Sequence, residues 1–154
     1  MGGRVGKLLS MASRAGRLAA RDPSTCLLVV RMGFWVVALV CLMKILSLRR
    51  AVEVVAGARP GPAPPDPLAT QERLAGVLDS LLAANFWVFT PTCWKRAPVL
   101  RRFLTLAGIE TRVVFGIRRG LGGKLDGHAW LEADGRPLLE ATAPDYRRTF
   151  AFPS

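Results

Sequence analysis

The sequence predicts an α+β domain in which helices come first and a short antiparallel sheet follows. Apolar residues recur at helical spacing up to Gly108, and at a spacing of two residues after it. Helices followed by strands, without alternation of the two, are typical of this class. The chain has 154 residues, 51% of them hydrophobic, which suffices for one domain core with an N-terminal appendage.

The N-terminal third carries most of the positive charge. Residues 1–59 hold ten Lys and Arg against two acids, a net +8 of the chain's +11. Such a field attracts acidic partners, but we find no zinc-finger spacing, RNP-type aromatic strand or recognition-helix signature, so no specific nucleic-acid binding is expected. The apolar stretch begins late and lacks a small-residue cleavage site, so we expect no cleaved signal.

The apolar stretch itself, residues 26–48, is predicted to form a helix. Its 23 residues would measure about 34 Å, but the charge-free part, residues 32–43, would span only about 18 Å of the roughly 30 Å of bilayer hydrocarbon. The flanking Arg31 and Lys44 could reach opposite interfaces. Two interpretations stay open: a helix packed in the protein or on a partner, and a membrane-associated helix.

A linker is predicted at residues 57–67, because its prolines preclude a helix. It divides the chain into an N-terminal basic and apolar helical region, residues 1–56, and a core, residues 68–154. Asp66 and Pro67 fit the N-cap and the first position of a helix. The apolar stripe of that helix is formed by Leu74, Val77, Leu78, Leu81 and Leu82.

The next helix is predicted to begin at Thr92, a good N-cap, and to stop at Gly108. Cys93 then lies in the opening turn, where the partial positive charge of the helix N-terminus stabilises a thiolate. Cys93 also fits a small buried apolar residue. Pro98 removes a helical hydrogen bond, so a later start or a kink is expected. One face carries Cys93, Ala97, Leu100, Leu104 and Ala107.

The cysteines and the single histidine limit the chemistry. Three cysteines at irregular spacing do not indicate a disulfide framework and fit a reducing cytoplasm. Cys26 and Cys41 lie on the apolar stretch and are interpreted as buried apolar residues. With one histidine and no CxxC, no metal site is expected. His128 is the one imidazole that could serve Cys93 as a base.

Three strands are predicted after Gly108. They cover residues 111–117, 128–132 and 136–142, and the last two flank the Asp134-Gly135 turn. A triad would need an acid to orient the imidazole of His128. The acids near it are Glu132, Asp134 and Glu140.

Hairpin geometry selects among these acids. A three-residue loop, residues 133–135, places apolar residues on one face and mostly polar residues on the other. That register pairs Glu132 with Arg136 and sets His128 directly opposite Glu140, with Cβ atoms about 5 Å apart. Glu140 is therefore expected to orient His128, Glu132 to be a surface ion-pair partner, and Asp134 to be a turn residue.

The stretch TCWKRAPVLRRFLTLAGIETRVVFGIRR, followed by GHAWLEADGRPLLE, resembles the transglutaminase-like peptidase family of lasso-peptide biosynthesis. The resemblance covers residues 92–140 well and the apolar N-terminal region more weakly. It implies a transglutaminase or papain-like core, in which a nucleophile helix packs on a short antiparallel sheet. It also implies that Cys93 is the nucleophile, His128 the general base and Glu140 the orienting acid. Many relatives have Asp at this third position, and Pro98 departs from the usual pattern.

The resemblance further implies an activity: a cysteine peptidase that cleaves the leader from a ribosomally made precursor peptide, with no metal or cofactor. The expected partners are the precursor, a separate leader-binding winged-helix protein and an ATP-dependent cyclase. Two alternatives stay open. One is a transglutaminase-like hydrolase or acyltransferase acting on another substrate; the other is a non-catalytic, membrane-associated binding module. We expect a cytoplasmic protein, with membrane contact through residues 26–48 as the alternative.

Overall fold

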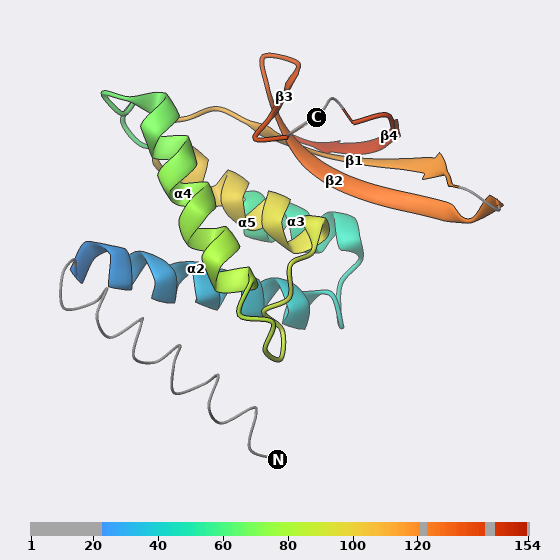
Figure 1. Ribbon diagram of the computed structural model, residues 1–154, viewed down its shortest axis with the longest axis horizontal. Helices are drawn as coiled ribbons and strands as arrows, with labels where there is room; N and C mark the ends of the chain where they lie inside the picture. The colour runs from blue at the N-terminus through green and yellow to red at the C-terminus, as the bar shows by residue number, and fades with distance from the viewer. Residues whose placement is uncertain (1–22, 121–122, 141–143, 154) are drawn as a thin grey trace.

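The computed structural model describes residues 23–120, 123–140 and 144–153, and in these ranges helices precede strands (Figure 1). The predicted α+β class is confirmed. Residues 1–22, the basic segment before the apolar stretch, lie outside the described residues, so the expectation of no cleaved signal stays a prediction. The elements are α2 (Pro23–Leu42), α3 (Leu48–Ala56), α4 (Pro67–Leu82), α5 (Cys93–Leu106), β1 (Arg112–Arg119), β2 (Leu125–Ala133), β3 (Arg136–Leu138) and β4 (Arg147–Phe152).

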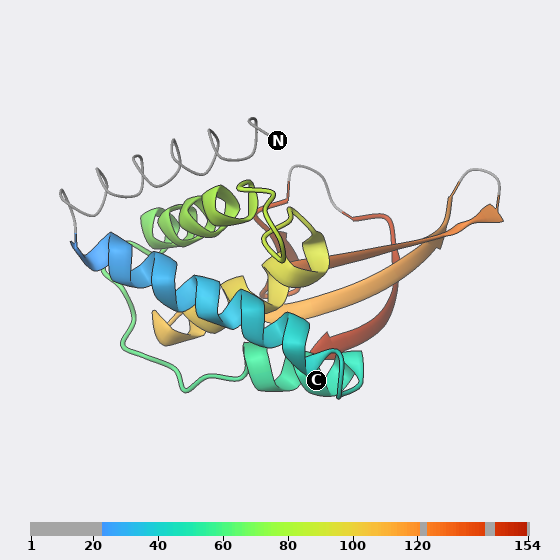
Figure 2. The ribbon, with the colours of Figure 1, turned by 90° about the horizontal axis from the view of Figure 1, so that it is seen from below.

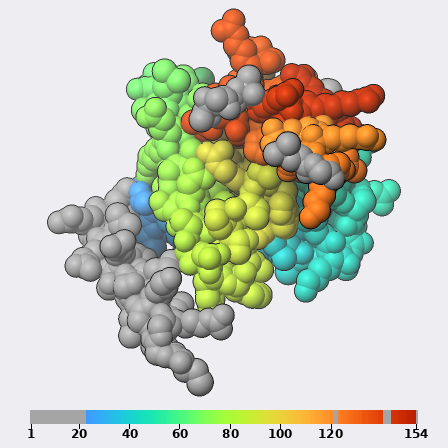
Figure 3. Space-filling model, turned by 45° about the vertical axis from the view of Figure 1, so that its right-hand side comes forward, coloured from blue at the N-terminus to red at the C-terminus, as the bar shows by residue number. Residues whose placement is uncertain are grey.

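The strands form one antiparallel sheet in the order β3-β2-β1-β4. The helices lie together on one side of this sheet, and the β1–β2 hairpin extends past them (Figures 1 and 2). In the space-filling view the strands, orange to red, lie above the yellow atoms of α5 and beside the green atoms at the upper left (Figure 3). Strand β4, which returns to pair with β1, was not predicted from the sequence.

One hydrophobic core joins the N-terminal helices to the rest of the fold. Helices α2 and α3 pack against α5, and α2 also packs against α4, while α5 packs on β2. Fully burying an aliphatic side chain of this kind stabilises a fold by about 1.5–3 kcal/mol. The core therefore depends on residues from both sides of the Pro-rich segment. Its members include Met32, Val36, Leu39, Val52, Val55, Leu78, Leu82, Leu100, Leu104, Ala129 and Leu131.

The helix predicted over residues 26–48 does not continue to residue 48, so the prediction was wrong at the C-terminal end of that helix. Helix α2 stops at Leu42, and Ser47 caps α3 by accepting a hydrogen bond from the Arg50 backbone N–H at 3.5 Å. Among the described helices, α2 alone is long and apolar enough to cross a membrane, by length and composition only. A core helix passes the same test, and α2 buries one face in the core.

The segment before α4 has no regular structure, as predicted, and lies along the end of α5. The Gly61 N–H donates to the Thr105 carbonyl at 3.0 Å, and a Cβ at Gly61 would collide with the Leu106 carbonyl. Helix α4 begins as predicted, with the Asp66 carboxylate accepting from the Ala69 N–H at 3.0 Å. Helix α5 begins at Cys93 and carries Pro98 inside it, so the later start is not observed.

Candidate active site

Cys93 is the first residue of α5. The extended backbone of Thr92 (φ −131°, ψ 136°) introduces the helix, but its hydroxyl makes no capping hydrogen bond. The first N–H groups of a helix have no partner within it, so those around Cys93 are left without a side-chain cap. Cys93 is half-buried and packs against the edge of the core. Two hydrogen bonds from Arg96 to Asp79, at 2.6 and 3.1 Å, tie this end of α5 to α4.

A tight turn precedes Cys93 and is fixed by a buried lysine. Phe86 and Phe89 exchange backbone hydrogen bonds around Trp87, which has φ +52° and is 72% exposed. The Lys95 ammonium donates to the Val88 carbonyl at 2.9 Å and to the Thr90 hydroxyl. Burial lowers the pKa of Lys95. These contacts hold the turn against the first turn of α5.

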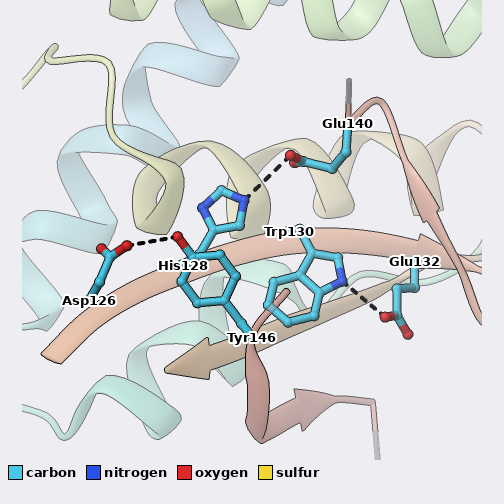
Figure 4. Close-up of polar contacts among 6 residues, drawn as sticks. All are labelled: Asp126, His128, Trp130, Glu132, Glu140 and Tyr146. Atoms are coloured by element: carbon cyan, nitrogen blue, oxygen red, sulfur yellow. Dashed lines mark hydrogen bonds and ion pairs between the residues drawn. The ribbon is translucent and has the colours of Figure 1, made fainter. Parts of the chain in front are cut away.

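His128 lies on β2, and its Nε2 atom is 3.4 Å from the Glu140 Oε2 atom (Figure 4). Both side chains are half-buried. The hairpin between them differs from our prediction: Ala133 pairs with Arg136, so the loop has two residues, not three. Its residues, Asp134 at φ +49° and Gly135 at φ +75°, are left-handed, as a type I′ turn requires.

The contact between His128 and Glu140 therefore arises by a different route. Continued past the Leu131–Leu138 pair, the observed register would set Glu140 opposite Ala129, on the core face. Strand β3 ends at Leu138, and Leu139 takes the left-handed conformation, with φ +58°. This reversal breaks the alternation of faces and brings the Glu140 carboxylate to the His128 ring.

Glu132 was predicted to be a surface ion-pair partner of Arg136, and this was wrong. Its side chain is 1% exposed. The Glu132 Oε1 atom accepts from the Trp130 indole N–H at 2.9 Å (Figure 4). The same atom pairs with Arg148 at 2.8 Å, while the Oε2 atom has no hydrogen-bond partner. The two-residue turn accounts for the error, because it pairs Glu132 with Pro137.

Two aromatic rings flank His128. The Trp130 ring is stacked with the imidazole at 5.9 Å between centroids, and the Tyr146 ring lies 5.2 Å away. The Tyr146 hydroxyl donates to Asp126 at 2.8 Å (Figure 4). Gly116 pairs with His128 across β1 and β2, and a Cβ there would lie 2.7 Å from the Tyr146 Cβ. Glycine at this position therefore leaves the room that the rings fill.

Electrostatics link Cys93 to this aromatic group. The hydrogen bond to Asp126 is the largest cause that raises the pKa of Tyr146, and Cys93 is the smallest. The same hydrogen bond, with a second one from Arg118 at 3.0 Å, lowers the pKa of Asp126. The structure thus brings His128 and Glu140 into contact and places Cys93 within electrostatic reach of Tyr146. Over the described ranges, no hydrogen bond joins Cys93 to His128.

Comparison with known families decides the class. The family model of the transglutaminase-like superfamily (Transglut_core3) matches residues 35–151. The chain belongs to the transglutaminase-like superfamily. Members of this superfamily are usually cysteine hydrolases or acyltransferases. The match begins within α2, so this transglutaminase-like domain includes helices that precede the Pro-rich segment. Searches among curated proteins and among solved structures returned no match.

The other two cysteines of the chain correct a further prediction. Cys26 and Cys41 are exposed, whereas the sequence indicated burial, because both lie on the outer side of α2. All three cysteines are free. Among the residues that the structure describes, no three His, Cys, Asp or Glu side chains are grouped to hold a metal ion.

Sequence reasoning missed several residues around His128: Gly116, Asp126, Trp130 and Tyr146. Tyr146 is the chain's only tyrosine, and it follows a segment with no periodic pattern, so no local signal tied it to the site. Asp126 stands two residues before His128 and therefore shares its face of β2, which is the one signal that was available.

Proposed function

We propose that this chain is a cysteine peptidase that removes the leader from a ribosomally made precursor peptide, as in lasso-peptide maturation. The observation that carries the proposal is the contact between His128 and Glu140 on the sheet that the Cys93 helix packs against. Membership of the superfamily supports thiol-based acyl chemistry. The resemblance of residues 92–140 to the lasso-peptide enzymes supplies the substrate class.

The proposed mechanism assigns one role to each group. The Cys93 thiolate attacks the scissile carbonyl, and the uncapped N–H groups at the start of α5 stabilise the oxyanion. His128 gives a proton to the leaving amine as the C–N bond breaks and a thioester forms. His128 then takes a proton from water, which attacks the thioester and releases the acid and the Cys93 thiolate, so that the thiolate and the protonated His128 are restored. Because Nε2 of His128 faces Glu140, Nδ1 is the nitrogen that exchanges the proton with Cys93.

The partners follow from the same resemblance. We propose that a separate winged-helix protein delivers the precursor by its leader, and that an ATP-dependent cyclase uses the product. We also propose membrane contact through the outer face of α2, where Leu27, Val30 and Phe34 are exposed apolar side chains. The basic N-terminal third favours an anionic surface.

Two alternatives remain for the function: an enzyme that acts on a different substrate, and a domain that is not catalytic. The family match is to the superfamily as a whole, and the same three side chains could serve a hydrolase or acyltransferase on another acyl donor. A non-catalytic domain would instead fit the geometry of His128, whose side-chain hydrogen bond among the described residues joins it to Glu140 and not to Cys93. A general ester substrate separates these two alternatives, since only an enzyme forms a covalent acyl group on Cys93.

Cleavage of a lasso-type precursor peptide tests the proposal. The precursor is incubated with the chain and a leader-binding winged-helix protein, and the products are weighed by mass spectrometry. We expect a free leader with the unaltered chain and none with Cys93→Ala. If the precursor stays intact but the ester substrate acylates Cys93, the chain is an acyl-transfer enzyme with another substrate and the peptidase proposal is wrong. No acylation at all would reject enzymatic function.

A further inference from the structure

A second cleft lies at the Ala133 end of β2, apart from the candidate active site. Its volume is about 460 Å³, and it is an open cleft bordered by the end of α5, the start of β1 and the β2–β3 turn. Neither Cys93 nor His128 nor Glu140 lines it. Its polar lining includes Arg101, Thr105, Glu110, Thr111, Arg112 and Glu132.

Three of these lining residues carry a buried oxygen without a hydrogen-bond partner. They are the Thr105 hydroxyl, the Thr111 hydroxyl and the Glu132 Oε2 atom, on side chains that are 5%, 6% and 1% exposed. The described residues hold five unpartnered buried side-chain atoms, and three of them are on residues that line this one cleft. Buried polar atoms nearly always have a hydrogen-bond partner in folded proteins. These three oxygens together therefore point to a ligand that donates hydrogen bonds.

The lining of the cleft carries more acidic than basic side chains. Its acids are Glu110, Glu132 and Asp134 and its bases are Arg101 and Arg112, while Arg148, outside the lining, pairs with the Oε1 atom of Glu132 and leaves the Oε2 atom without a partner. Arg101 is already engaged, because its guanidinium donates to the Thr111 and Ala56 carbonyls. The lining groups that still lack a partner are mostly hydrogen-bond acceptors. A charged N–H group is the best donor for a carboxylate oxygen without a partner.

We propose that this cleft binds a compact organic cation, the guanidinium or ammonium group of an Arg or Lys side chain in a peptide. The N–H groups of that cation would donate to Glu132 Oε2 and to the hydroxyls of Thr105 and Thr111. The cleft is lined by none of the groups of the proposed peptidase, so the proposal holds whether or not Cys93 is a nucleophile.

The Trp130 indole provides the readout, since its N–H already donates to the same Glu132 carboxylate. We would follow its ¹H–¹⁵N resonance, assigned with Trp130→Phe, while adding Nα-acetyl-arginine amide to the Cys93→Ala chain. We expect a saturable shift with this probe and none with the uncharged Nα-acetyl-citrulline amide. An equal response to both probes, or no shift with either, would overturn the proposal.

Matched variants keep the test specific. Glu132→Gln removes the charge with little change in shape and is expected to weaken binding by about tenfold. Thr111→Val removes a hydroxyl that has no partner in the free protein, so the fold should tolerate it while binding weakens. Asp145→Asn removes one exposed charge outside the cleft and should leave binding unchanged. Equal binding by Glu132→Gln, Thr111→Val and Asp145→Asn would contradict the assignment.

Discussion

The Nε2 atom of His128 lies 3.4 Å from the Oε2 atom of Glu140 only because Leu139, between Glu140 and the end of β3, is left-handed. The strand register alone would turn the Glu140 carboxylate to the opposite face of the sheet. A single backbone conformation therefore determines whether the acid reaches the imidazole.

The left-handed Leu139 predicts an unusual sensitivity to side-chain branching. A β-branched residue is strongly disfavoured at positive φ, whereas an unbranched one of similar volume is not. We expect Leu139→Ile to lower the free energy of unfolding by about 1–3 kcal/mol more than Leu139→Met does. Urea denaturation of both variants measures the difference. Equal stabilities would show that Leu139 is not left-handed in solution.

Gly116 predicts a second stability effect, with a matched control in α4. A Cβ at Gly116 would lie 2.7 Å from Tyr146 and 2.9 Å from Trp130, so Gly116→Ala should cost about 1–3 kcal/mol of unfolding free energy. Gly76 is an exposed helical glycine with nothing within 4 Å of its added Cβ, so Gly76→Ala should stabilise by about 0.5–1 kcal/mol. Changes of the same sign would contradict the packing of Tyr146 and Trp130 over Gly116.

The single tyrosine makes the Tyr146–Asp126 hydrogen bond directly measurable. The bond raises the pKa of Tyr146 above 10.0 and lowers that of Asp126 below 3.8. Its stabilisation is therefore full between these ordinary values. It is lost as pH rises through the raised Tyr146 pKa, or falls through the lowered Asp126 pKa. Ultraviolet absorbance of the phenolate should show titration above pH 10 in the unaltered chain and a lower midpoint in Asp126→Asn.

The same titration tests the position of Cys93. Cys93 is the smallest of the causes that raise the pKa of Tyr146, so Cys93→Ser should also move the phenol midpoint down, by less than Asp126→Asn does. Cys41→Ser, which changes an exposed cysteine of α2, is the control and should leave it unchanged. A midpoint that Cys93→Ser does not alter would place the thiol away from the aromatic group.

Much of the fold could be predicted from local sequence. The start of α4 at Pro67 and that of α5 at Cys93 have strong local signals, and the strands around His128 show spacing of two residues. The prediction of a three-residue turn was wrong because it rested on the separation of apolar and polar residues onto opposite faces of the hairpin. The chain instead uses the two-residue turn and corrects the position of Glu140 at Leu139. A non-glycine residue in the left-handed region has no reliable sequence signal.

The surroundings of His128 were harder to predict, because they depend on contacts between distant segments. Tyr146 reaches His128 only once β4 has returned to pair with β1. The burial of Glu132 likewise depends on Arg148, sixteen positions later in the chain. Neither contact has a period or spacing that a single sequence reveals.

The reactivity of Cys93 tests the central claim most directly. In a chain with Cys26 and Cys41 replaced by Ser, we would compare the rate of iodoacetamide alkylation at pH 6.5 with that of the same chain carrying His128→Ala. At this pH an ordinary thiol is mostly protonated and slow to react. Pairing with His128 predicts that the histidine variant reacts at least about tenfold more slowly. Equal rates would contradict a Cys93–His128 pair and the peptidase built on it.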